Sequence, residues 1–288
     1  MLPLLHQNAF AMHLHYSAAA AATAPQSLHV CSGKDLRASV QQQVQLAVIQ
    51  GMEALEATIS ELLSPNEGAG DCSSLASIIA ELSHPDTLRL LLAQLLRSEQ
   101  ALAGIQARSD YHHNGFRKLV LLQNKAFKLR LHLWEARSER HHENIHDHRW
   151  NFASALLAGS FKTVIWEEDA QGPEVRLDCT YTPARHGSVY AVRENGQVRL
   201  REQATLTLGA GDVYYMPAST LHQVTDPGAG ATRTLMLTAT PVLANCKLYA
   251  EHSIPESDKV NMPFSSGEIR RELTSLLLHT CQQPALAA

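Results

Sequence analysis

The feature that most constrains the fold is a series of short β-type runs in the middle of the chain, each bounded by turn-forming residues. In the first run, 127–134, apolar residues alternate with polar or aromatic ones, which is the period of a strand with two different faces. About ten such runs at this spacing indicate a β-sandwich or β-barrel. We expect strands at 127–134, 152–157, 161–166, 175–181, 188–192, 198–201, 204–208, 213–216, 221–224 and 233–238.

The first 110 residues show a helical pattern instead. A capping-box spacing at 32–35 precedes apolar residues that recur at helical period up to Leu62, and a Pro- and Gly-containing segment then ends that helix. We expect a second helix at 73–82, and a third that begins at Pro85 and ends near Arg108. A last helix is expected at 266–279. These helices contain no cluster of metal-ligating residues, so packing is their expected role.

Charge and cysteine content exclude several classes of protein. The net charge is −4 and no basic run is present, so nothing indicates nucleic acid or an anionic membrane as a partner. The five cysteines are scattered and never spaced as CxxC, which argues against a disulfide framework or a zinc ribbon and favours a reducing, cytoplasmic location. No stretch is apolar enough to span a bilayer.

Two segments suggest a metal site. His146 and His148 are two residues apart, so on a strand both imidazoles would point to the same side. Further along, Gly211-Asp212 leads into a strand, Pro217 ends it, and His222 begins the next strand.

Together these segments resemble the two sequence motifs of the cupin superfamily, also described as RmlC-like. The resemblance implies a mainly β fold, a cupin (double-stranded β-helix or jelly-roll) barrel, here with an N-terminal α-helical region and a C-terminal helix. It also implies that His146, His148 and His222 ligate a metal. Many cupins add a glutamate a few residues after the first motif, but Asn151, Phe152 and Ala153 stand there. A three-histidine site is therefore expected, with Fe(II) as the expected ion and Zn, Ni, Mn or Cu as alternatives.

These interpretations divide the chain into four parts. Residues 1–30 are expected to be a disordered extension, and 31–110 a helical region. The cupin barrel is expected at 111–255, and a C-terminal tail with its helix at 256–288.

Residues 116–240 are also similar to cysteine dioxygenase and related thiol dioxygenases. Arg117 matches the arginine that holds the substrate carboxylate in that family, a role that suits the planar guanidinium. The family's serine–histidine–tyrosine relay is absent, because Met236 and Thr238 stand at its histidine and tyrosine positions. The resemblance therefore implies a similar barrel and metal cage with a different substrate chemistry.

Other candidate substrate-binding residues follow from strand alternation. Arg130 and His132 share one face of their strand with Trp134, and Trp150 should lie on the same side as the two motif histidines. Tyr214 is a further candidate, with Tyr190 and Gln223 as weaker ones. No catalytic residue is assigned.

Three functions remain open at this point. The first is a dioxygenase-like oxidoreductase that binds O2 and a small acidic or amino-acid-like substrate, with a homodimer possible. The second is a non-redox metal enzyme, such as an isomerase, lyase or hydrolase, in which the ion acts as a Lewis acid. The third is a non-enzymatic cupin module that binds a small molecule.

Overall fold

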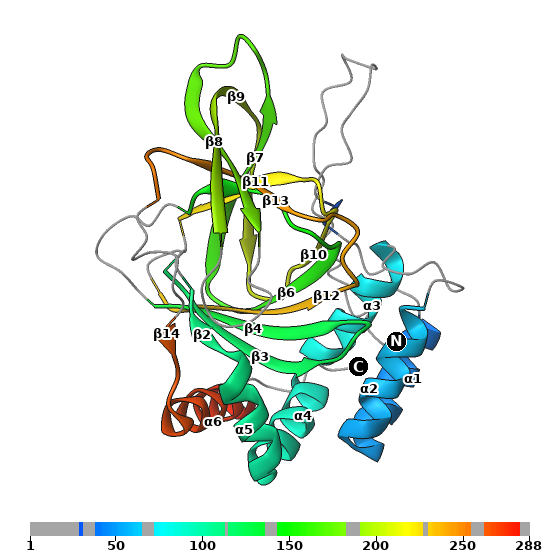
Figure 1. Cartoon of the computed structure of the whole chain (residues 1–288). Helices are drawn as coiled ribbons and strands as arrows, with labels where there is room; N and C mark the ends of the chain where they lie inside the picture. Colours follow the sequence, from blue (N-terminus) through cyan, green and yellow to red (C-terminus); the bar gives the residue numbers. More distant parts are fainter. Residues whose placement is uncertain are drawn as a thin grey trace, which may run out of the picture.

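The computed structural model describes residues 29–30, 38–64, 72–112, 115–135, 143–182, 191–226, 230–254 and 262–282. In these residues the protein is mainly β, with two antiparallel sheets facing one another, five helices before them and one after (Figure 1). This is the fold class predicted from the sequence. None of the described helices is both long and apolar enough to cross a membrane.

The first sheet has eight strands, all paired antiparallel. Their order is β1 (His29–Val30), β10 (Val213–Met216), β6 (Phe152–Ala158), β12 (Thr232–Thr238), β4 (Lys128–Trp134), β3 (Arg117–Gln123), β2 (Asp110–Tyr111) and β14 (Met262–Pro263). The short strand β1 lies within the predicted extension 1–30, and the other residues of that extension lie outside the described part of the chain.

The second sheet closes on itself. Its order is β11 (Leu221–Asp226), β5 (Ile145–His146), β13 (Cys246–Ala250), β8 (Glu174–Thr182), β9 (Ala191–Gly209) and β7 (Ser160–Glu168), and β7 pairs again with β11. The long strand β9 pairs with β8 along its first half and with β7 along its second half. Where the sequence predicts short strands at 188–192, 198–201 and 204–208, the structure thus has one continuous strand from residue 191, and residues 188–190 lie outside the described part.

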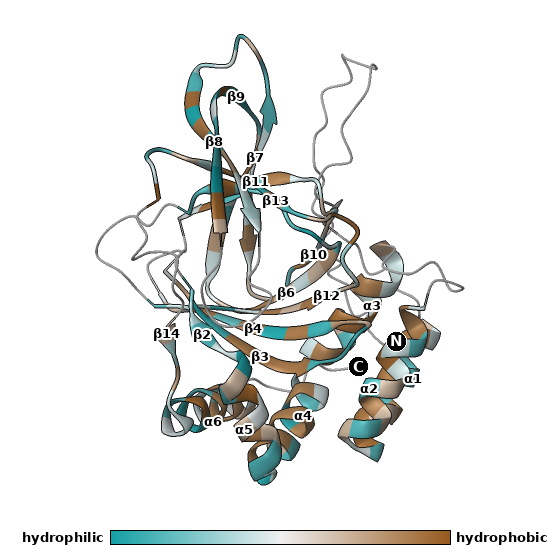
Figure 2. Ribbon diagram, viewed as in Figure 1, coloured by the Kyte–Doolittle hydropathy of each residue, from teal (hydrophilic) through white to brown (hydrophobic). Residues whose placement is uncertain are grey.

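The helices cover the outer face of the first sheet (Figure 1). They are α1 (Ala38–Gln50), α2 (Met52–Leu62), α3 (Cys72–Ser83), α4 (Pro85–Arg97), α5 (Glu99–Arg108) and α6 (Ser266–Gln282). Leucines of α4 and of β4 belong to one continuous apolar core, because the odd-numbered residues of β4 all point toward the helices. In Figure 2 apolar residues recur on the helices and on the sheet that they cover, whereas much of the projecting β8–β9 hairpin is hydrophilic.

Two predicted helices are each divided into two. Gly51 has φ of 122° and separates α1 from α2, a backbone conformation that glycine adopts without steric cost. Ser98 separates α4 from α5, and its side chain accepts a hydrogen bond from the Ala101 backbone N–H at 3.1 Å. Ser98 is therefore the N-cap of α5, and periodicity alone did not reveal this break.

Arg117 ties the first sheet to the C-terminal helix. Its guanidinium forms an ion pair with Glu272 of α6 and a second one with Glu135, where Nη2 lies 3.1 Å from the carboxylate. The side chains of Arg117 and Glu272 are 21% and 18% exposed, so water screens this pair less than it screens a fully exposed one.

We expect the Arg117–Glu272 pair to contribute measurably to stability. In a double-mutant cycle with Arg117→Met and Glu272→Gln, followed by denaturant unfolding, the coupling free energy should be about 1 kcal/mol. The matched control is the exposed pair Arg270–Glu99 between α6 and α5, for which we expect a smaller coupling. Equal coupling in the two cycles would contradict the expectation.

Candidate metal centre

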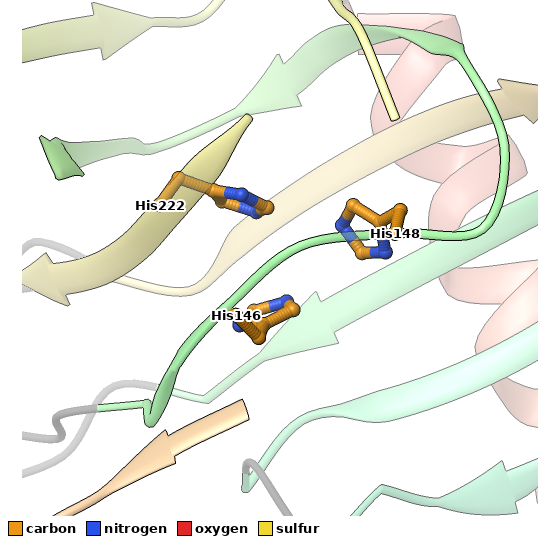
Figure 3. A group of neighbouring side chains, drawn as sticks. All are labelled: His146, His148 and His222. Carbon is orange, nitrogen blue, oxygen red and sulfur yellow. The ribbon is translucent and has the colours of Figure 1, made fainter. Parts of the chain in front are cut away.

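Three histidines converge inside the barrel. His146 lies on β5 and His222 on β11, and the two residues are direct partners in the antiparallel register. His148 follows two residues after His146, and its backbone N–H donates to the Ala218 carbonyl at 2.9 Å. One ligand atom from each imidazole lies within 4.8 Å of the other two. Figure 3 shows the rings gathered around one point, two from the segment at β5 and one from β11.

The protonation of these rings suits metal binding. Nδ1 of His146 donates to the Asn144 carbonyl at 2.8 Å, and Nδ1 of His222 donates to the Thr220 carbonyl at 3.1 Å. Since a carbonyl can only accept, these bonds place the proton on Nδ1 and leave Nε2 free to coordinate. Burial lowers the pKa of all three histidines, and lowers that of His222 to about 3, so the imidazoles are neutral at pH 7.

Asp147 fixes the segment between the two motif histidines. Its carboxylate accepts from the Lys247 backbone N–H at 2.6 Å, and its own N–H donates to the Lys247 carbonyl at 3.2 Å. This exchange attaches the segment to β13 beyond the end of β5. Aromatic neighbours then orient His148: Phe152 meets it edge-on and Trp150 stacks beside it at 22°.

The donor set matches the three-histidine site implied by the sequence. Asn151 stands where many cupins have a ligating glutamate, and its Oδ1 accepts from the Ala218 backbone N–H at 2.9 Å. That side chain therefore supports the loop that also holds His148. Three neutral nitrogen ligands in a desolvated setting suit a divalent transition metal and do not select one by themselves. The cluster can thus hold a metal ion, whose identity the geometry leaves open.

A small cavity of about 150 Å³ opens beside His146 and His148. Arg130 and His132 of β4 line it, as predicted from strand alternation, and so does Trp150. The Arg130 guanidinium carbon lies 4.6 Å from the centroid of the Trp150 ring. Arg130 and His132 are only 8% and 6% exposed, so the polar groups on this wall of the cavity are buried.

Arg117 and Tyr214 do not lie where the sequence predicted, and this is a correction. The side chain of Arg117 lies on the face of β3 that points away from the cavity, and it pairs with Glu272. Tyr214 does not line the cavity, because its ring packs edge-on against Phe152 and Phe161 inside an apolar cluster. Of the weaker candidates, Gln223 donates through Nε2 to the Glu143 carbonyl, and Tyr190 lies outside the described residues.

Several cavity residues were not predicted. Lys118 lines the cavity, one residue after Arg117. The alternation of polar Lys118 with apolar Leu119 was the sequence signal that could have placed Lys118 on the cavity side of the strand. Strand β13 was also missed, and it contributes Cys246, Lys247 and Leu248 to the lining. Its five residues show neither a strand nor a helix period, so the sequence pattern did not predict this strand.

Glu143 lies outside any strand, two residues before β5, yet it is buried. It is 5% exposed, near the Trp134 indole, and its backbone N–H donates to the Val224 carbonyl. Burial raises the pKa of its carboxyl group to about 8. A largely protonated carboxylic acid therefore lies three residues before His146.

No protein-family model matches the sequence, and no curated protein is significantly similar to it. Among solved structures, a double-stranded β-helix protein from Klebsiella pneumoniae is similar over 46% of this chain and 84% of its own, with 11% identity and a TM-score of 0.28. A cupin domain from Bordetella pertussis is similar over 44% and 94%, with 14% identity and a TM-score of 0.25.

A third solved structure is an enzyme, the hydroquinone 1,2-dioxygenase PnpCD in complex with Cd2+ and 4-hydroxybenzonitrile. It is similar over 43% of this chain and 64% of its own, with 13% identity and a TM-score of 0.27. At these scores none of the three bears on the reaction of this chain, which has to be argued from the site itself.

We expect each of the three histidines to be required for metal binding. Changing His146, His148 or His222 to alanine should weaken affinity for Fe(II) or Zn(II) by more than about 100-fold, because loss of a supporting residue alone costs 10- to 100-fold. Metal content after dialysis and titration calorimetry measure this. Exposed His252 provides the control, His252→Ala, which should bind normally. Stoichiometric metal in any of the three variants would remove that residue from the site.

The buried Glu143 predicts a pH-dependent stability. Its pKa is raised from 4.5 to about 8 on folding, so its contribution to stability is intact below about pH 4.5 and declines as the pH rises to 8. Glu143→Gln removes this decline, so the variant should gain stability over the wild type between pH 5 and 8.5, by an amount on the order of a few kcal/mol. Urea unfolding at several pH values tests it, with exposed Glu53→Gln as control; parallel profiles would contradict the buried ionisation.

Proposed function

We propose that this protein is a mononuclear metal-dependent oxygenase, with Fe(II) held by His146, His148 and His222, that acts on a small acidic or amino-acid-like molecule. The observation that supports it is a cluster of three neutral imidazoles, two of which line a small cavity that Arg130 also lines. Three ligands leave further coordination positions for a substrate and for O2.

The size and walls of the cavity limit the substrate. At about 150 Å³ it is smaller than the 300–1,000 Å³ typical of sites for drug-sized ligands, and an amino-acid-sized molecule matches it better. Phe116 and Trp150 provide apolar walls, whereas Arg130 and His132 provide polar ones. A substrate with one anionic end and a short apolar or polar body complements this lining.

The residues that line the site would have separate roles in the reaction. Fe(II) bound by the three imidazoles would supply the electrons that activation of O2 requires. Arg130 would bind the acidic group, and the aromatic walls would exclude bulk water from the reacting end. Met236 lines the cavity where the thiol dioxygenases have a relay histidine, so no acid–base group is available at that position. His132 is a buried imidazole in the cavity, and burial together with Arg130 and Lys118 lowers its pKa well below the usual range, so its neutral ring would offer a hydrogen-bond acceptor and not a base.

The test is oxygen consumption by the full chain supplied with Fe(II) and a panel of small carboxylic and amino acids. We expect at least one acid to give O2 uptake that needs Fe(II), fails with Zn(II), and is lost in His222→Ala. His252→Ala should leave that uptake unchanged. Turnover of a substrate with Zn(II) and without O2 would instead identify a non-redox metal enzyme.

A further inference from the structure

Arg130 is a buried cation that has no hydrogen-bond or ion-pair partner among the described residues. It is 8% exposed, and its Nε has no hydrogen-bond acceptor among the residues that the structure describes. Burial lowers the pKa of the guanidinium to about 10, so the group is still charged at pH 7. A buried charge without a counter-charge is unfavourable, and a ligand anion in the cavity would supply that counter-charge.

The neighbouring charges do not supply the missing partner. Asp110 is the described carboxylate that has the largest electrostatic interaction with Arg130. However, Asp110 already pairs with Lys118, whose Nζ lies 3.0 Å from its carboxylate. The Lys118–Asp110 pair is neutral as a whole. Arg130 therefore leaves one uncompensated positive charge on this wall, which matches a single anionic group.

Trp150 restricts which part of the Arg130 guanidinium can donate hydrogen bonds to a ligand. The guanidinium lies over the indole ring, a cation–π contact that leaves its N–H edge as the part able to donate. The edge of a guanidinium fits a planar carboxylate, in which two oxygens accept two parallel N–H bonds. His132 adds a buried Nε2 without a described partner on the same strand face. With one uncompensated positive charge, this wall matches a singly charged anion such as a carboxylate better than a doubly charged one such as sulfate.

We propose that Arg130, oriented by Trp150, binds the carboxylate of a small monocarboxylate ligand inside the cavity, and that Arg117 takes no part in this. That the ligand is a substrate rests on the function proposed above, whereas the binding of the carboxylate does not. The anion subsite would then lie on β4, one strand away from the arginine that the sequence resemblance indicated.

The experiment measures binding of propionate to the full chain, with propionamide as its neutral counterpart. Chelator-treated protein and the His222→Ala variant are used, so that a metal cannot bind the carboxylate. We expect propionate to raise Tm in a saturable way in both, and propionamide to have no effect. Nitrate, which is planar, should compete with propionate better than sulfate does.

Three arginine variants locate the site. Arg130→Met should raise the half-saturating propionate concentration at least about tenfold, and Arg130→Lys should recover only part of the loss, because an ammonium group lacks the planar fork. Arg117→Met should bind propionate as the wild type does. If Arg130→Met does not fold, the comparison of Arg130→Lys with Arg117→Met still decides.

The outcomes separate the two proposals. Unchanged propionate binding in the Arg130 variants, loss of binding in Arg117→Met, or a preference for sulfate would overturn the carboxylate subsite. Loss of propionate binding in the Arg130 variants supports it, even if no acid gives Fe(II)-dependent O2 uptake. In that case the oxygenase proposal fails and the anion site remains.

Discussion

The site depends on one strand pairing. Because β5 and β11 are antiparallel neighbours with His146 opposite His222, two imidazoles from distant parts of the chain face the same volume. A shift of one residue in this register would turn His222 away from the barrel interior. The pairing is short, since β5 has only two strand residues, so its register needs support from elsewhere. That support comes from Asp147, which exchanges hydrogen bonds with the backbone of Lys247 on β13, and from Ala218, which binds both the backbone of His148 and the side chain of Asn151.

Burial in the barrel interior has different effects on the charge of the three histidines and on the charge of Arg130. On the metal side, burial keeps the imidazoles neutral, which is the form that can coordinate. On the β4 side, burial leaves Arg130 charged, because a guanidinium holds its proton even when its pKa falls. A metal ion held by the imidazoles would, together with Arg130, attract an anionic molecule from both ends, and the small cavity would leave little room for water to screen that attraction.

The fold class and the grouping of the three histidines could be predicted from sequence because their signals are local. Alternation along β4 predicted that Arg130 and His132 share a face, and the spacing of His146, His148 and Trp150 predicted a common side. The breaks at Gly51 and Ser98 and the small strand β13 were not found, since each depends on a single residue or on a partner strand far away in sequence. The burial of Glu143 could not be predicted either, because a carboxylate in a loop normally lies in water.

The misplacement of Arg117 has a specific cause. Carrying a residue over from a resembling family fixes its position in the sequence, but not the side of the strand on which it lies. In β3 the odd-numbered Arg117 and Leu119 face the helices, while Lys118 faces the cavity. Leu119 belongs to the core shared with the helices, so turning Arg117 inward would expose that leucine to a polar cavity and bury Lys118 against apolar side chains. The packing of the helical layer therefore decides which cations reach the cavity beside His146 and His148: Lys118 on β3 and, on the neighbouring strand where Leu129 and Leu131 face the helices, Arg130.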